Sequence, residues 1–418
     1  MGYRRGVGVV VATVVLTVAV GCGSSSDSQE STEPAYAATL RPVIDELMKD
    51  NVIPGAVVLV KSPKEGDWTA TFGTGRLGTD TPITAEDHFR FGSNTKTVTV
   101  TVLMQLAQAG KLALDDPIGK YVPDVPNGDR ITLAQLAEMR SGLYSYTFDE
   151  QFNADLDNDP TRVWTTRQLL DIAFAHPVNF APGERFEYSN TNTILLGLVI
   201  EKVTGEPVGD SFRRDVFDRL GLRNTSFPAA TDSSIPDPHP QGYAFGTNVS
   251  TIDTFALPPD QQAAALAGTL KPADQTTASP SWTWTAGAMI STVGDMATYV
   301  KALADGGLLD ARMQQTRIDS IQPIDPANPA MAGYGLGIVR FGEHLLGHDG
   351  QMPGFMTFMG SDPDSGLTIV VATNLATVPS GEGSALVLVK GMLPTFYGAN
   401  ALPGHDPARP ETGPSPTR

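Results

Sequence analysis

The sequence predicts an α+β protein whose antiparallel sheet is built from both ends of the chain, flanked by helices and interrupted by a mostly helical insertion. Three observations predict this arrangement. Two runs of apolar and β-branched residues occur early, at 56–61 and 68–72. Helical and loop-rich patterns fill the middle of the chain. Further β-like runs follow only after residue 334.

The remaining elements follow from local patterns, taken in chain order. Residues 93–109 alternate Thr and Val in part, but their length and the closing Gly110 favour a buried helix. Residues 228–280 are rich in Pro, Asp, Ser and Thr and are expected to be a long irregular excursion. Other helices are predicted at 40–48, 133–139, 166–175, 191–203, 292–304 and 385–396, and the later strands at 335–341, 345–350, 355–360 and 367–373.

Composition excludes several classes of protein. The 418 residues include 29 Lys plus Arg and 46 Asp plus Glu, giving a net charge of −17. Nucleic-acid binding relies on basic side chains that neutralise phosphates, so this balance argues against a nucleic-acid partner. The one cysteine, Cys22, excludes an intrachain disulfide and a cysteine-based zinc site.

The first residues are typical of an export signal. Arg4 and Arg5 precede a mostly apolar run at 7–20, which is short for a membrane-spanning helix. The run ends at Cys22, in a context that resembles the bacterial lipobox, where the cysteine is lipidated. We therefore expect a signal peptide at 1–21, a lipidated Cys22 with a flexible tether at 22–35, a folded domain at 36–400 and a disordered tail at 401–418. The predicted location is the outer face of the cell membrane, with plain secretion as the alternative.

Three short motifs carry candidate chemistry. Ser93 and Lys96 form S-x-x-K, Tyr188 and Asn190 form Y-x-N, and His348-Asp349-Gly350 forms H-x-G. Residues three apart on a helix share a face, so Lys96 can reach the Ser93 hydroxyl. Serine needs a base to become a nucleophile, and a lysine that is desolvated loses its proton more readily. A tyrosine between two cationic groups is expected to be acidified by their charges.

Two other patterns are set aside. Gly73 to Gly78 spells G-x-G-x-x-G, but the Thr-Asp-Thr-Pro that follows disfavours the helix that a dinucleotide site needs, so we expect a glycine-rich hairpin. Asp155, Asp157 and Asp159 begin like a calcium loop, yet Pro160 replaces the required glycine. An acidic solvated loop is the simpler interpretation.

Residues that flank the three motifs, and other short segments between them, form further recognisable motifs. They include Phe91-Gly92-Ser93-Asn94-Thr95-Lys96, Arg140-Ser141-Gly142-Leu143, Ala181-Pro182-Gly183, Tyr334-Gly335-Leu336-Gly337 and Gly347-His348-Asp349-Gly350. Across about residues 38–396, the chain resembles the penicillin-recognising serine hydrolases. The nearest resemblance is to D-alanyl-D-alanine carboxypeptidases, with class C β-lactamases and related esterases further off. The fold implied is that of β-lactamases and DD-peptidases.

The resemblance implies a role for each matching residue. Ser93 would be the acylated nucleophile, Lys96 its proton-handling partner and Tyr188 an acid and base. Substrate contacts would come from Asn190, His348 and Gly350, and the backbone N–H groups of Ser93 and Gln351 would hold the oxyanion. Phe152 and Trp282 would line the cleft. No metal or organic cofactor is implied.

Two departures bear on the substrate. The carboxypeptidases typically carry Thr where this chain has Asp349, and an arginine where it has Val339. An added acid and a lost base both disfavour an anionic substrate end. The leading hypothesis is carboxypeptidase-like activity on cell-wall stem peptides. An esterase or weak β-lactamase is the alternative, and a non-catalytic lipoprotein that binds wall peptides or β-lactams is a third. Oligomeric state cannot be read from the sequence.

Overall fold

The computed structural model describes residues 1–2 and 33–398. Cys22, nearly all of the predicted signal peptide and the predicted tail at 401–418 lie outside these residues. Within the part that is described, no helix is both long and apolar enough to cross a membrane.

The centre of the folded unit is an eight-stranded sheet in the order β2-β1-β12-β11-β10-β9-β8-β7, in which every neighbouring pair is antiparallel. Ala56 near the start of β1 lies opposite Thr373 at the end of β12. Both chain ends therefore build one sheet, as the sequence predicts. The strands are β1 (Gly55–Lys61), β2 (Trp68–Gly73), β7 (Gln322–Pro323), β8 (Ala332–Tyr334), β9 (Val339–Phe341), β10 (Leu345–Met352), β11 (Phe355–Ser361) and β12 (Thr368–Thr373).

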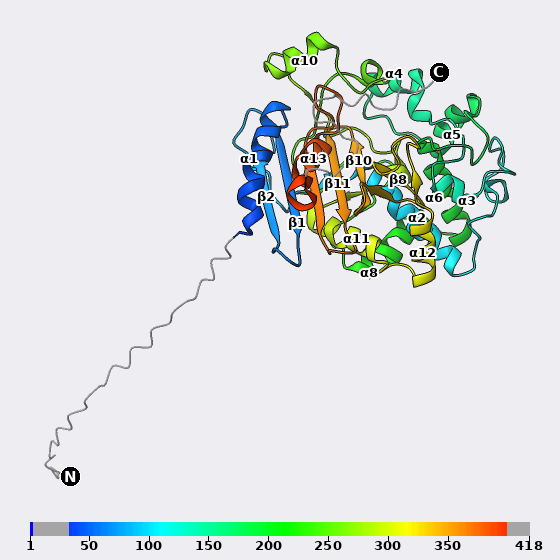
Figure 1. The fold of residues 1–418 in the computed structure, drawn as a ribbon, viewed down its shortest axis with the longest axis horizontal. Coiled ribbons are helices and arrows are strands. Elements are labelled where there is room, and N and C mark those ends of the chain that lie inside the picture. The colour runs from blue at the N-terminus through cyan, green and yellow to red at the C-terminus, as the bar shows by residue number, and fades with distance from the viewer. Residues whose placement is uncertain (3–32, 399–418) are drawn as a thin grey trace. The chain divides into compact units, whose positions relative to one another are not determined.

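Helices cover both faces of this sheet (Figure 1). α1 (Ala35–Asp50) and α13 (Ser384–Tyr397) pack together on one face, and α11 (Val293–Asp305) lies against β1, β11 and β12. Two smaller sheets pair β3 (Phe89–Arg90) with β6 (Ile290–Ser291) and β4 (Tyr243–Ala244) with β5 (Ala273–Asp274). The other α-helices are α2 (Thr95–Gln108), α3 (Leu133–Ala137), α4 (Glu150–Asn158), α5 (Thr166–Ala175), α6 (Asn190–Thr204), α7 (Val208–Phe212), α8 (Asp218–Leu220), α9 (Asn248–Thr251), α10 (Pro259–Leu266) and α12 (Ala311–Asp319).

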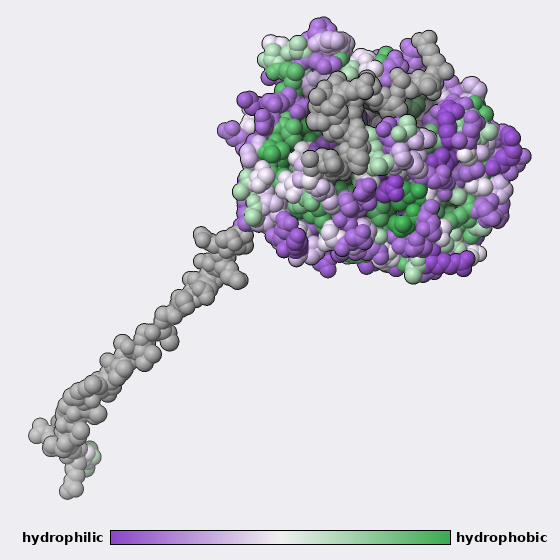
Figure 2. Space-filling model, viewed as in Figure 1, coloured by the Kyte–Doolittle hydropathy of each residue, from purple (hydrophilic) through white to green (hydrophobic). Residues whose placement is uncertain are grey.

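The central strands are apolar on both sides because both sides are covered. In β1, Val58 and Val60 pack in the cluster with α1 and α13, whereas Val57 and Leu59 pack in the larger cluster that includes α11. Successive side chains of a strand point to opposite faces, so the continuous run Val57–Val60 supplies two cores at once. On the face shown in Figure 2, the coloured surface is mostly hydrophilic, with smaller apolar areas between.

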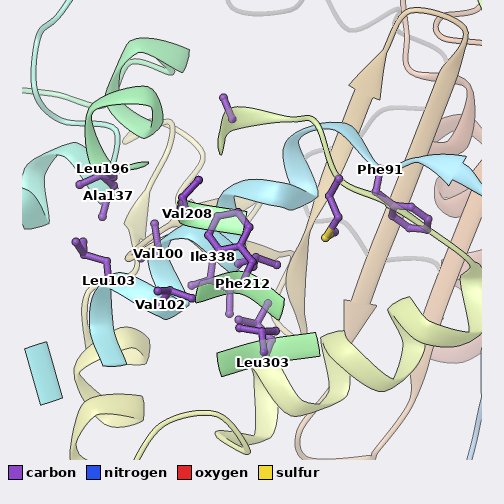
Figure 3. Close-up of a cluster of buried hydrophobic side chains, with 14 of the residues drawn as sticks. Phe91, Val100, Val102, Leu103, Ala137, Leu196, Val208, Phe212, Leu303 and Ile338 are labelled. Atoms are coloured by element: carbon purple, nitrogen blue, oxygen red, sulfur yellow. The ribbon is translucent and has the colours of Figure 1, made fainter. Parts of the chain in front are cut away.

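Helix α2 is buried along most of its length and occupies the middle of the larger core. Figure 3 shows Val100, Val102 and Leu103 of α2 among Leu196, Leu303 and Ile338 from other elements. Its threonines are accommodated because their hydroxyls bond carbonyl groups; Thr97 Oγ1 donates to Asn94 O at 2.7 Å, for example. The Thr-Val alternation therefore belongs to a helix.

Several sequence-based expectations were wrong in detail. Residues 335–341 are not one strand, because β8 and β9 are joined by a tight turn at 335–338. Gly337 has φ +62° there, and a Cβ at that position would lie 2.5 Å from Val100 Cβ. The helix predicted at 133–139 ends at Ala137, and the excursion at 228–280 contains β4, β5, α9 and α10.

The acidic run at 155–159 is also not a solvated loop. Asp155 and Asp157 lie on α4, which begins where Asp149 accepts a 2.7 Å hydrogen bond from the Phe152 N–H. Asp155 pairs with Arg162, with Oδ2 2.8 Å from Nη1. The capping carboxylate that starts the helix was not recognised from the sequence. By contrast, the glycine-rich hairpin predicted at 73–78 is present, since Thr74 forms an antiparallel bridge with Pro82 and Gly73 and Gly78 have φ of +71° and +77°.

Candidate active site

Ser93 and Lys96 lie where a 3₁₀ turn, η1 (Gly92–Asn94), runs into α2. Lys96 Nζ donates to Ser93 Oγ at 2.9 Å and to the carbonyl oxygen of Ala286 at 2.7 Å. The i, i+3 spacing places the two side chains on one face of the helix, as predicted. The structure therefore brings together an amine and a hydroxyl in direct contact.

The environment of Lys96 favours its neutral form. The side chain has no exposed surface, and burial lowers its pKa well below the usual value, an effect that the nearby Asp349 carboxylate opposes. A neutral amine can accept a proton, whereas an ammonium group cannot. Lys96 is thus suited to take the hydroxyl proton of Ser93.

Tyr188 lies next to this pair, just before α6. Lys96 Nζ is 4.8 Å from the centroid of the Tyr188 ring, and Tyr188 lines the same pocket as Ser93. Burial, with Tyr334 and Asp349 contributing, raises the pKa of Tyr188 well above its usual value. The expectation that neighbouring cations would acidify this phenol was wrong, because burial of the phenol dominates and Tyr334 and Asp349 oppose its ionisation further. A neutral phenol is suited to donate a proton.

His348 lies behind Tyr188 and is not among the residues that line the pocket described below. It is 2% exposed, with Nε2 3.1 Å from the Tyr334 hydroxyl and Nδ1 2.5 Å from the carbonyl oxygen of Asp349. Burial lowers its pKa, which Asp349 opposes. The structure places His348 as a neutral neighbour of two tyrosines. Its direct contact with substrate stays a prediction.

Two glycines allow the Ser93 turn to approach β10 closely. A Cβ on Gly350 would lie 2.0 Å from the carbonyl oxygen of Phe91 and 2.9 Å from the backbone nitrogen of Ser93. A Cβ on Gly92, which has φ +52°, would lie 2.6 Å from the backbone nitrogen of Gln351. The main-chain nitrogens of Ser93 and Gln351 are therefore near one another. This arrangement could hold an oxyanion, as the sequence interpretation requires.

A pocket of about 300 Å³ opens beside Ser93. Tyr188, Asn190 and Gln351 also line it, together with Phe152 and Trp282, which the sequence placed in the cleft. Phe152 is held by aromatic contacts, with ring centroids 4.9 Å from Trp164 and 6.0 Å from Trp282. Asn190 Nδ2 donates to Thr147 Oγ1 at 3.2 Å.

The described lining of this pocket includes a negatively charged side chain but no positively charged one. Among the described residues that line it, none is Lys, Arg or His, and Asp157 is the one carboxylate. Val339 is 5% exposed and packs in an apolar cluster with Met139 and Tyr334, so it offers no charge to a ligand. The described residues also contain no group of three or more His, Cys, Asp or Glu placed to hold a metal ion.

Sequence reasoning missed three groups of residues at this site. Tyr334 was noticed only as part of a motif, although its hydroxyl contacts His348. Asn94 and Thr357 are joined by a buried hydrogen bond across 263 residues. Asp157 was read as part of a solvated loop. Apart from the motif around Tyr334, no local pattern could have indicated these contacts.

Comparison with known proteins assigns the family. The family model described as Beta-lactamase matches residues 40–389, which is most of the chain. The chain belongs to the beta-lactamase family. Its fold is that of the penicillin-recognising serine hydrolases, as the sequence resemblance implied.

Solved structures of this fold include two amidases. A D-stereospecific amidohydrolase from Streptomyces sp. is 32% identical with a TM-score of 0.73, and the match covers 87% of this chain and 99% of that one. A D-amino acid amidase from Ochrobactrum anthropi SV3 is 27% identical with a TM-score of 0.70, covering 85% and 98%.

The curated relatives that the chain matches first are longer than the chain itself. Protein flp from Staphylococcus aureus (strain MW2) is 27% identical over 343 residues, which is 80% of this chain and 62% of the relative. The chain thus spans about three fifths of the length of the curated relatives that it matches first.

Proposed function

We propose that this protein is a serine hydrolase that cleaves small amides or esters whose carboxyl end carries no negative charge, with amides of D-amino acids as the leading substrates. The observation that carries the proposal is the desolvated Lys96 amine, 2.9 Å from Ser93 Oγ, beside a pocket lined by no cationic side chain among its described residues. The D-configuration is supported by the likeness to two amidases that act on D-substrates.

Acylation of Ser93 would be the first half of the reaction. As Ser93 Oγ attacks the carbonyl carbon, Lys96 Nζ takes the hydroxyl proton, and the new oxyanion lies near the backbone N–H groups of Ser93 and Gln351. The Tyr188 phenol donates its proton to the departing nitrogen or oxygen. Tyr188 then recovers a proton from the Lys96 ammonium group. The carbon–nitrogen or carbon–oxygen bond is replaced by a serine ester.

Hydrolysis of that ester would complete the cycle. Lys96, neutral again, accepts a proton from the attacking water, and the resulting ammonium group gives that proton to Ser93 Oγ as the ester bond breaks. The products are a carboxylic acid and a free enzyme. The 2.9 Å contact of Lys96 Nζ with Ser93 Oγ and its position 4.8 Å from the Tyr188 ring centroid support proton transfer among these three residues. The reaction needs no redox step.

The carboxypeptidase hypothesis is less well supported by this site. Its substrates end in a carboxylate, and so do β-lactam antibiotics. A buried or half-buried carboxylate needs a positive partner or several donors, and the described lining includes no cationic side chain. The esterase alternative predicted from the sequence agrees better with the charge of the pocket. The contact between Ser93 and Lys96 argues against a purely binding role.

One panel of substrates distinguishes these possibilities. Purified protein is incubated separately with D-phenylalaninamide, a p-nitrophenyl ester, a peptide ending in D-Ala-D-Ala and a penicillin, and turnover and intact mass are followed. We expect turnover of the amide and the ester that disappears in Ser93→Ala. Preferred turnover of the D-Ala-D-Ala peptide would favour the carboxypeptidase. No turnover and no covalent adduct with any compound would contradict hydrolysis and favour a binding role.

We also propose, from the sequence, that the protein is exported and anchored by lipid at Cys22. The support is the lipobox-like run before that residue. Metabolic labelling with a radioactive fatty acid tests it, with Cys22→Ala as the control. Incorporation into both proteins, or into neither, would overturn the anchor.

A further inference from the structure

One wall of the pocket is formed by the segment 246–255, which contains the short helix α9. This wall lies beside α4, and its residues that line the pocket are Gly246, Thr247, Asn248, Thr251, Ile252 and Phe255. The segment contributes backbone, hydroxyl and apolar surface to the pocket and carries neither the Ser93–Lys96 pair nor Tyr188. It is therefore available to the part of a ligand other than the reacting carbonyl.

Asp157 of α4 holds this wall in place. Its Oδ1 accepts hydrogen bonds from the Asn248 backbone N–H at 2.7 Å and from Asn248 Nδ2 at 2.8 Å, and its Oδ2 accepts from the Val249 N–H at 3.0 Å. Within the described chain, the other hydrogen bonds recorded for 247–255 are internal or involve Ala256. A single carboxylate thus links the wall to α4.

The same contacts limit what Asp157 can do for a ligand. Both carboxylate oxygens of Asp157 already accept hydrogen bonds from N–H groups of the wall, so the wall's N–H groups stabilise the negative charge. Asp157 is consequently a positioning residue, and its role is distinct from that of an ion-pair partner for a substrate ammonium group.

Two aromatic side chains at the pocket remain largely open to solvent. Phe255 of the wall is 49% exposed, and Phe148, from the turn Tyr146–Phe148, is 46% exposed. Both line the pocket, as does Ile252. Covering apolar surface is favourable by about 25 cal/mol per Å², so a large apolar group bound between them would gain affinity. Leu266 is similarly exposed but does not line the pocket.

We propose that Phe255, Phe148 and Ile252 form an apolar subsite that selects substrates with an aromatic or long aliphatic side chain, and that Asp157 fixes the wall carrying two of them. This inference rests on the proposed Ser93 hydrolase and names its substrate class. Continuity of these residues with Ser93 in one pocket supports a substrate group as the occupant.

Substrate selectivity tests the subsite directly. We compare kcat/KM for D-phenylalaninamide and D-alaninamide in the wild type, Phe255→Ala and Phe148→Ala, with Leu266→Ala as the matched control. Loss of one apolar contact in a binding pocket reduces kcat/KM by about tenfold or more. We expect a loss of that size for D-phenylalaninamide and a clearly smaller loss for D-alaninamide, while Leu266→Ala changes neither. Equal losses for both amides, or none for either, would overturn the subsite.

The role of Asp157 needs a readout that a general loss of stability would not change. Asp157→Ala removes all three acceptor contacts, while Asp157→Asn keeps one carbonyl oxygen as acceptor. We expect amide hydrogen exchange to accelerate at 247–252 and KM to rise more for D-phenylalaninamide than for D-alaninamide, with Asp157→Asn intermediate. Unchanged exchange and unchanged selectivity in Asp157→Ala would overturn the positioning role.

Equilibrium binding separates failure of the subsite from failure of the proposed function. Calorimetry of Ser93→Ala with each amide measures recognition without turnover. Tighter binding of D-phenylalaninamide that is lost on adding Phe255→Ala supports the subsite even if the wild type hydrolyses neither amide. Equal binding of the two amides overturns the subsite even if hydrolysis is intact.

Discussion

The side-chain amide of Asn94 donates a 2.8 Å hydrogen bond to the hydroxyl of Thr357, joining the turn that carries Ser93 to strand β11. Both residues are fully buried. Asn94 Nδ2 also donates to the carbonyl oxygen of Phe91, and Thr357 Oγ1 lies 3.2 Å from the carbonyl oxygen of Gly350. One pair of side chains therefore fixes the spacing between the two backbone segments that carry the proposed oxyanion donors.

Replacing Thr357 by valine keeps the shape of the side chain but removes the hydroxyl. Asn94 would then have a buried donor with one fewer partner, which costs about 1–3 kcal/mol of folding free energy. We expect kcat to fall about tenfold or more, because the oxyanion donors lose their fixed spacing. Thr357→Ser keeps the hydroxyl and is expected to retain most activity. Thermal unfolding and kinetics check this, and a valine variant with lowered Tm but unchanged kcat would contradict it.

Lys96→Met tests whether the buried amine is a base. Methionine occupies a similar volume without a titratable group, so we expect activity to fall by about a thousandfold or more while the fold is retained. At pH 7 we also expect Tm to rise, since the folded wild type holds a lysine that would otherwise be charged in water. Substantial remaining hydrolysis would exclude Lys96 as the base.

The pH dependence of the same residue gives an independent check. Because burial lowers the Lys96 pKa, kcat/KM should rise with pH through a value well below 10.5. Between that value and 10.5 the unfolded chain binds one more proton than the folded chain, so stability rises with pH across this window. The Tm gain of Lys96→Met should accordingly be large at pH 7 and small near pH 10. A gain that does not vary with pH would rule out this linkage.

Glu138 provides a test of stability away from the reacting groups. Burial raises its pKa to about 7, against the lowering effect of Arg140. The folded state then holds a proton that the unfolded state loses above about 4.5, so stability falls as pH rises from about 4.5 to 7. We expect Glu138→Gln to stabilise the protein by about 1–3 kcal/mol at pH 8 and to have little effect at pH 4. Denaturant unfolding of the wild type and Glu138→Gln at pH 8 and pH 4 measures this difference in unfolding free energy. An equal difference at the two pH values would contradict the prediction.

Gly350→Ala tests the close approach of β10 to the Ser93 turn. The added methyl would lie 2.0 Å from a backbone oxygen, so backbone must shift. We expect at least about a hundredfold loss of kcat/KM, with Gly360→Ala, on the neighbouring strand, as a milder control. There the nearest atom is 3.0 Å away, at the end of the Phe358 side chain. Similar activities for the two variants would contradict the proposed geometry.

Local spacing predicted the parts of this site that are local in the chain. The contact between Ser93 and Lys96 follows from their spacing, because residues three apart in a helical segment lie on the same face. The contact from Tyr334 to His348 spans β9, and the contact from Asn94 to Thr357 joins the η1 turn to β11. Both depend on how distant elements are arranged, which spacing along the chain does not determine. The direction of the Tyr188 pKa was missed for a related reason, because it depends on burial from several elements.

The same distinction holds for the fold. Apolar runs predicted β1, β11 and β12 closely, since both faces of these strands are buried and their pattern is continuous. β2 was also predicted, but its pattern alternates instead, because every second residue of that strand is exposed. The turn between β8 and β9 was missed, because it depends on a glycine that meets Val100 of a distant helix. Asp157 was misread as solvated because its three N–H partners lie 91 or 92 residues further on.

The pairing of β1 with β12 has a consequence for how the chain acquires its structure. Val57 and Ala372 are adjacent in the sheet although more than three hundred residues separate them. Such long-range strand pairing forms slowly, because the entropy cost of closing a large loop comes before the stabilisation from the contact. A chain that is still being synthesised therefore holds an incomplete sheet with an unpaired edge until residue 373 has emerged. During that interval, β1 and β2 are the segments most in need of protection from aggregation.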